Sequence, residues 1–235
     1  MYITNKRYIE PEMIVTDLVP DNPSFLLVLE HFGIDDVLKD KTISQICREH
    51  GVSESIFTAV CNLYNDFNFT GQEMLKREDI PVIIRFLRNS HRYYSFEKYP
   101  EILNNIKKLS VAGHEKEIKM VEDFFNEYFL EVKEHLEYEE EIVFPYFTRL
   151  AENREAKTVE RFSASQYLDH HTDIESKLSD LKNLLLKHLH IPNLNSSKRK
   201  LLYALFELEY DLKVHSMVEE QILIPLGISL EKEGN

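Results

Sequence analysis

Two segments of this chain, "HLEYEEEIVFP" (135–145) and "HSMVEEQILIP" (215–225), are identical at five of eleven positions. Each has a histidine, two adjacent glutamates that start four residues later, an isoleucine and a final proline. Residues four apart lie on the same face of an α-helix. The repeat therefore predicts two helices, each of which presents an imidazole and a carboxylate on an otherwise apolar face.

Helical periodicity continues on both sides of the two segments. Apolar residues recur at spacings of three and four over the regions about 80–97, 115–150, 159–188 and 198–231. Tyr99-Pro100 interrupts the pattern after the first region, and a short helix is expected from there to about residue 111. We also expect a kink or the end of regular helix at Pro145 and Pro225.

The composition supports the same fold class. The chain has 235 residues with only 6 glycines and 8 prolines, which favours helices over a turn-rich β fold. Long amphipathic helices with short connections are typical of antiparallel bundles. We predict an all-α protein: a small helical N-terminal domain at residues 1–72, followed by an antiparallel four-helix bundle at residues 73–235.

The N-terminal part contains shorter helical signals. "NPSFLLVLEHFGI" (22–34) predicts a helix that ends near Gly33. "TISQICREHGVSESIFTAVCNLYND" (42–66) predicts two helices joined by a turn at 50–53, with Ser53 as the N-cap of the second.

Histidines and glutamates interrupt the apolar faces of the long helices. The face of the second region, for example, runs through Phe125, Val132, His135, Glu139 and Ile142. The residues at such core-facing positions are His91, His114, His135, Glu139, His171, His215 and Glu219.

A metal site explains this set better than separate core histidines do. A single histidine on an apolar face is usually an ordinary core residue, and His-x-x-x-acid spacing also occurs at His31 and His50. However, burying two carboxylates with five imidazoles costs several kcal/mol unless cations compensate. Glu140 and Glu220 point about 100° away from the site and are expected on the outer faces.

The donor types narrow the choice of metal. Imidazole suits iron, zinc and copper, while carboxylates can bridge two ions. Seven ligands exceed what one tetrahedral zinc site takes. Ferritin-type sites use Glu-x-x-His, and no histidine in this chain has a glutamate three residues before it.

The order of these residues, together with Tyr99-Pro100, resembles the hemerythrin-like (HHE) four-helix bundle. The nearest branch is that of the iron–sulfur cluster repair ("repair of iron centres") proteins. The resemblance implies two non-haem iron ions, oxo- or hydroxo-bridged, held by five histidines and two bridging glutamates. Two six-coordinate irons offer about twelve positions, so about one stays open for a small diatomic ligand, O₂ or NO.

The N-terminal part departs from that family, which carries a Cys-Cys pair shortly after Gly-[Ile/Leu]-Asp. Here 33–35 is followed by Asp36-Val37-Leu38. The only cysteines, Cys47 and Cys61, lie on apolar helical faces, so we expect them in the core. Thiol chemistry of that pair is therefore not expected.

Three functions remain open. The resemblance implies repair of damaged iron–sulfur proteins under oxidative or nitrosative stress. The open iron position is equally suited to an O₂- or NO-binding or sensing protein. "TISQICREHGVSESIF" (42–57) also resembles a helix-turn-helix of a DNA-binding regulator. Its second helix has no Arg or Lys, and the net charge is −13, which disfavours nucleic acid.

No apolar run approaches the ~18 residues of a membrane span, and the N-terminus has no signal-like apolar core. We expect a cytoplasmic protein that does not bind membranes, either a monomer or a homodimer. The pattern leaves open whether it is an enzyme.

Overall fold

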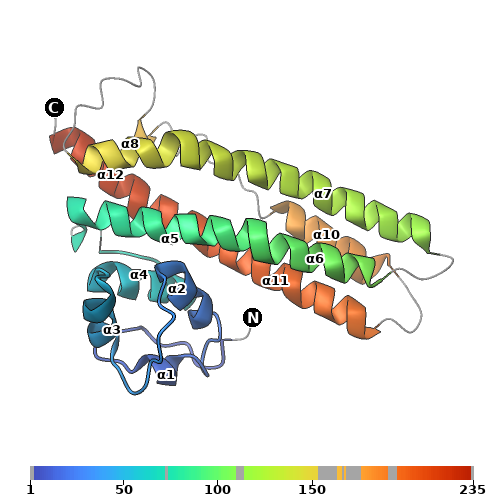
Figure 1. Ribbon diagram of the computed structural model, residues 1–235, viewed down its shortest axis with the longest axis horizontal. Coiled ribbons are helices and arrows are strands. Elements are labelled where there is room, and N and C mark those ends of the chain that lie inside the picture. The colour runs from blue at the N-terminus through green and yellow to red at the C-terminus, as the bar shows by residue number, and fades with distance from the viewer. Residues whose placement is uncertain are drawn as a thin grey trace. The chain divides into compact units, whose positions relative to one another are not determined.

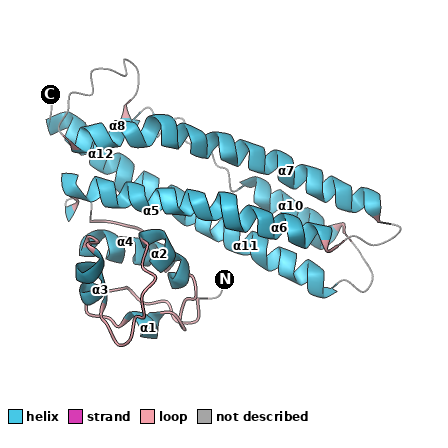
Figure 2. Cartoon of the chain, viewed as in Figure 1, coloured by secondary structure: helices cyan, strands magenta, loops and turns pink. Residues whose placement is uncertain are grey.

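The computed structural model describes residues 3–71, 74–109, 114–152, 163–165, 167, 176–189 and 195–233. Over these residues the regular structure is helical, apart from one isolated antiparallel bridge between Ile14 and Thr42 (Figure 2). The predicted all-α class is confirmed. No helix in the described ranges has the length and apolar character that a membrane crossing requires.

The chain divides into two compact units. The first contains Met1–Ser90, Glu140–His171 and Val214–Asn235, and the second contains His91–Glu139 and Thr172–Lys213. The predicted domain boundary at residues 72 and 73 lies outside the described residues and stays a prediction.

The first four helices belong to the first unit. They are α1 (Val15–Leu18), α2 (Phe25–Phe32), α3 (Ile43–His50) and α4 (Glu54–Tyr64). Helix α2 ends at Gly33 with φ 72°, a left-handed conformation that glycine adopts without strain. Thr42 and Gln45 form a capping box at the start of α3, and Ser53 is the N-cap residue of α4. The helices predicted within residues 22–34 and 42–66 are confirmed.

Helix α4 is the buried centre of this N-terminal segment (residues 3–71). Every residue from Ala59 to Tyr64 is buried. The Asn62 amide accepts a hydrogen bond from the Ile9 N–H at 2.7 Å and donates to the Ile9 carbonyl at 3.0 Å. Asn22 donates to the Tyr64 carbonyl at 2.7 Å. Neutral side-chain amides therefore tie the irregular backbone of this segment to α4.

In the second unit, four helical segments contact one another around an apolar core. They are α6 (Tyr99–Lys107), α7 (Glu115–Tyr138), α10 (Ser176–Lys187) and most of α11 (Asn195–Val218), seen side by side in Figure 1. The Tyr99 ring stacks on Phe129 of α7 with 3.8 Å between centroids.

Ion pairs connect the remaining neighbours of this unit. Lys177 of α10 pairs with Glu131 of α7, and Lys182 of α10 pairs with Glu209 of α11. Lys98, just before α6, pairs with Glu207 of α11. The contacts run from α6 to α7, α10, α11 and back to α6. A bundle of long helices is consistent with this closed set of contacts.

Within the described residues, three π-helical segments interrupt the long helices. Segment η3 (Tyr94–Lys98) joins α5 (Ile80–Tyr93) to α6, η4 (Glu139–Val143) joins α7 to α8 (Phe144–Ala151), and η5 (Glu219–Leu223) joins α11 to α12 (Ile224–Glu233). A π-helical N–H bonds to the carbonyl five residues earlier. The Tyr99 N–H donates to the Tyr94 carbonyl, and the Ile224 N–H donates to the Glu219 carbonyl.

A proline is the second residue of the helix after each π-helical segment: Pro100, Pro145 and Pro225. Proline has no N–H. It can therefore directly follow the residue that makes the last π-helical hydrogen bond, and no backbone donor is left unpaired. The interruption predicted at each proline thus takes the form of one wide turn in a continuing helix.

The side chains of the two repeated segments differ in burial. An α-helical period placed Ile142 on the core-facing side, but Ile142 is 37% exposed and Val143 is fully buried. The prediction for Ile142 was wrong, whereas the equivalent Ile222 of η5 is fully buried, as its period predicts.

Candidate metal centre

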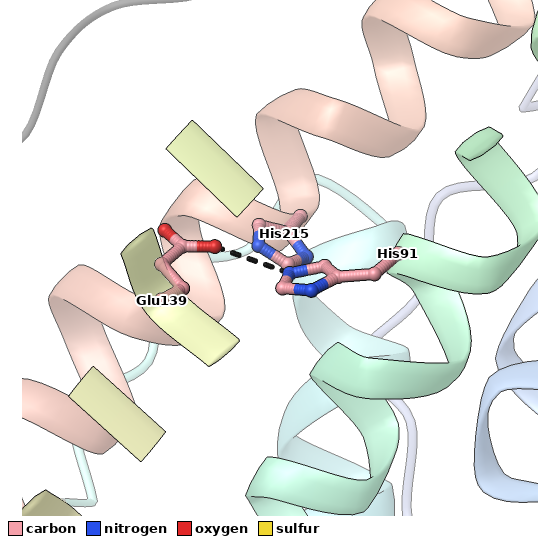
Figure 3. Close-up of side chains that lie close together, drawn as sticks. All are labelled: His91, Glu139 and His215. Atoms are coloured by element: carbon pink, nitrogen blue, oxygen red, sulfur yellow. Dashed lines mark ion pairs between the residues drawn. The ribbon is translucent and has the colours of Figure 1, made fainter. Parts of the chain in front are cut away.

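Glu139, the first residue of η4, has no exposed surface and lies between two histidines. Its Oε1 is 2.7 Å from Nε2 of His135, one turn earlier on α7. Its Oε2 is 3.1 Å from Nε2 of His91 on α5, a contact visible in Figure 3. The two oxygens of one carboxylate thus face two different imidazoles, as in a carboxylate that bridges two cations.

The second copy of the repeat presents the same pair of groups. His215 is 2% exposed and Glu219 is fully buried. Nε2 of His215 lies 3.6 Å from Oε2 of Glu219. On the other side of the ring, Nδ1 lies 2.8 Å from the Ser90 hydroxyl. The Tyr167 hydroxyl donates to Oε1 of Glu219 at 3.2 Å.

These side chains form two groups that share Glu139. His91, Glu139 and His215 form one group, drawn in Figure 3, and His135, Glu139 and Glu219 form the other. Within each group the ligand atoms lie within 4.8 Å of one another. Ligands about 2.1 Å from one ion lie about 3–4 Å apart, so both groups can hold metal ions.

Hydrogen bonding alone is the competing interpretation. Distances of 2.7 Å and 3.1 Å also suit imidazole N–H donors to a carboxylate. What favours a metal is the combination of Glu139 and Glu219, both without exposed surface, with three imidazoles in two overlapping groups. A buried carboxylate either has positive charge close by or takes up a proton, and two of them beside three imidazoles suit cations.

The structure brings together five of the seven predicted ligands: His91, His135, Glu139, His215 and Glu219. His171 lies outside the described residues. The outward prediction for the second acids agrees with the structure, since Glu220 is exposed and Glu140 pairs with Arg88 at 2.8 Å.

His114 is not brought to these groups. It is the N-cap residue of α7, its side chain is 32% exposed, and its Nδ1 lies 4.0 Å from Glu117. His135 follows 21 residues later, at the other end of the same helix. A rise of about 1.5 Å per residue separates the two histidines by about 32 Å along the axis.

Two polar neighbours of the ligands were not predicted from the sequence. Ser90 directly precedes His91, and Tyr167 lies four residues before His171. The second spacing is a helical one and was an available signal. The position of Ser90 next to His91 was not such a signal, because consecutive helical residues point in different directions.

No family model matches this chain, and comparison with curated proteins and with solved structures likewise finds no match. The resemblance to hemerythrin-like proteins therefore rests on the sequence pattern. The structure itself provides helices with buried groups of histidine and glutamate that can hold metal ions.

Proposed function

We propose that this chain is a dinuclear non-haem iron protein built on an antiparallel four-helix bundle of the hemerythrin-like type. The observation that carries the proposal is the Glu139 carboxylate, whose two oxygens face Nε2 of His91 and Nε2 of His135 at 3.1 Å and 2.7 Å. In two-metal sites a bridging carboxylate holds the ions about 3.5–4 Å apart.

The two groups suggest how the ligands divide between the ions. One ion would be held by His91 and His215 and the other by His135, with Glu139, which is common to both groups, and Glu219 as the proposed bridges. His171, which lies outside the described residues, stays a predicted ligand. Without His114, these residues fill about eight of twelve positions in two six-coordinate irons. The rest are available to a bridging oxygen, water and a small ligand such as O₂ or NO.

Metal analysis of the purified protein tests the centre. We expect about two irons per chain in protein prepared under reducing conditions. His135→Ala and Glu219→Ala should lose iron, and His114→Ala is the matched control that should retain it. Stoichiometric zinc, or no metal, would exclude a di-iron centre. Equal iron loss in His114→Ala and His135→Ala would exclude this ligand assignment.

For the cellular role we propose repair of iron–sulfur proteins damaged by oxidants or nitric oxide, motivated by the sequence resemblance. A centre with open positions is suited to accept or release iron. Loss of the gene should slow the recovery of a damaged iron–sulfur enzyme in cells. The wild-type gene should restore recovery and a Glu139→Gln gene should not. Recovery at the normal rate without the gene would rule this role out.

The open positions also support a second candidate, an O₂- or NO-binding or sensing protein. The anaerobically reduced protein should then change its visible spectrum on addition of either gas. A spectrum that stays constant with both gases would discard this candidate.

DNA binding through α3 and α4 receives no support from the charge of α4. A recognition helix contacts bases with its N-terminal residues, and the residues of α4 that are not buried, Glu54, Ser55 and Thr58, carry no positive charge. Absence of a gel shift at low salt is the expected result.

A further inference from the structure

We propose that Ser90 is a positioning residue that fixes the orientation and tautomer of His215 for metal binding. This proposal rests on the proposed function of the centre. Ser90 has no exposed surface and lies on α5, one residue before His91. Its Oγ makes two short contacts, 2.7 Å to the Leu87 carbonyl oxygen and 2.8 Å to Nδ1 of His215.

The single hydroxyl proton decides the direction of both hydrogen bonds. A carbonyl oxygen only accepts, so the contact to Leu87 is a hydrogen bond only when the Ser90 O–H donates to it. Oγ then accepts, and the proton in the second contact comes from Nδ1 of His215. The reverse arrangement would leave two oxygen acceptors 2.7 Å apart with no proton between them.

When the single ring proton of His215 is on Nδ1, the other ring nitrogen, Nε2, is unprotonated and can bind a cation. In the neutral ring, Nε2 then carries the lone pair that binds a metal. Nε2 is the atom on the side of Glu219, 3.6 Å from its Oε2. Metal-binding histidines are generally held in this way, by an oxygen that accepts from the second ring nitrogen.

Helical geometry explains why Ser90 can serve a different histidine from its neighbour. Consecutive residues of a helix point about 100° apart. His91 is directed to Glu139, while Ser90 is directed to His215. One turn of α5 thus supplies one ligand and the group that orients another.

The ordinary interpretation is a serine that bonds the carbonyl three residues earlier in its own helix, which is common. It accounts for the contact to Leu87. It does not account for the second contact, to an imidazole nitrogen at 2.8 Å in a site without exposed surface.

The ring nitrogens of His215 can be observed directly by ¹⁵N NMR in the metal-free wild-type protein. We expect a protonated Nδ1. An unprotonated Nδ1 would overturn the proposal, and this measurement needs no variant at position 90. It also separates the two proposals, because wild-type protein that bound no metal would overturn the function and leave the ring measurement valid.

Ser90→Ala should lower iron affinity about 10-fold or more, the range found for groups that orient metal ligands. Its His215 ring signals should also shift. Ser90→Thr keeps the hydroxyl and should regain both properties, at least in part. Ser24→Ala removes another serine with no exposed surface and should leave iron affinity unchanged. Wild-type affinity and wild-type ring signals in Ser90→Ala would overturn the proposal.

Discussion

The N-terminal segment and the two candidate metal-binding groups, His91/Glu139/His215 and His135/Glu139/Glu219, bury polar side chains in two different ways. In the N-terminal segment the buried polar side chains include the amides of Asn22, Asn62 and Asn65, which bond to backbone groups. In the metal-binding groups they are ionisable, and Glu139 faces His91 and His135. A neutral amide that forms hydrogen bonds with backbone groups needs no ion to compensate its burial. A buried carboxylate stays ionised only with positive charge or hydrogen-bond donors nearby, and otherwise takes up a proton.

This difference separates stability from metal binding. Amide contacts should contribute the same free energy with or without metal. Carboxylates and imidazoles should contribute chiefly when a cation is bound, since a buried charged pair alone is weakly stabilising at best. Variants in the N-terminal segment should therefore lower the free energy of unfolding and leave metal affinity unchanged. Variants in the two groups should lower metal affinity with little effect on the stability of the metal-free protein.

The largest effect is expected from Glu139→Gln. The amide keeps the shape of the side chain but removes the charge that the two proposed ions would share, so metal affinity should fall by more than about 100-fold, beyond the range for groups that only orient ligands. The urea stability of the metal-free protein should change little, because the amide has nearly the same volume and its oxygen can accept a hydrogen bond from a neutral imidazole. Equilibrium dialysis with metal analysis and urea unfolding provide the two measurements. Retention of two ions would contradict the bridging assignment.

Asn62→Ala should show the reverse behaviour. It leaves the buried N–H and carbonyl of Ile9 without their side-chain partner. The free energy of unfolding should fall by about 3 kcal/mol, since each lost buried partner costs about 1–3 kcal/mol. Metal affinity should not change. Asn68→Ala, at an exposed asparagine, is the control, and an equal loss of stability there would contradict this account.

The sequence predicted the two turns that carry the candidate ligands, 135–139 and 215–219, because each helix keeps its α-helical period as far as the glutamate. His135 and Glu139 lie four residues apart on one helical face, and the same is true of His215 and Glu219. After the glutamates the two copies differ: Ile222 in η5 is fully buried, as its period predicts, whereas Ile142 in η4 is 37% exposed.

Periodicity also gives the face of a residue but not its height along the axis. His114 shares the apolar face of α7 with His135, yet the length of the helix separates them by about 32 Å. Partners such as Ser90 depend on where two helices approach each other, and a pattern within one helix does not contain that information. The sequence therefore predicted which histidines and glutamates gather in the two buried groups, but not the polar side chains that contact them.

A smaller effect is expected from Tyr167→Phe, which removes the hydroxyl that donates to Glu219. The loss of one hydrogen bond to a charged acceptor is worth about 1.5 kcal/mol, so metal affinity should fall about 10-fold. Tyr146→Phe is the matched control, because the Tyr146 hydroxyl donates to Glu231, which belongs to neither metal-binding group. Equal affinity loss in both variants would indicate a general effect on packing rather than on the centre.

The smallest effect at neutral pH concerns the two thiols of the N-terminal segment. Burial, with a smaller contribution from Glu54, raises the pKa of Cys47 to about 12, and burial also raises the pKa of Cys61 well above its usual value. The folded state thus retains protons that the unfolded state releases above a pKa of 9.0. The free energy of unfolding should be constant below about pH 9 and should fall as the pH rises toward 12.

Thiol reagents test whether these cysteines belong to the structural region or to the chemistry. In the folded protein near neutral pH both thiols should react slowly, because both are 2% exposed and protonated, and both should react at once after unfolding. Cys47→Ala and Cys61→Ala should lower stability by leaving small cavities, yet retain the full metal content. Loss of metal in either variant would connect the N-terminal segment to the centre and remove the distinction between the two regions.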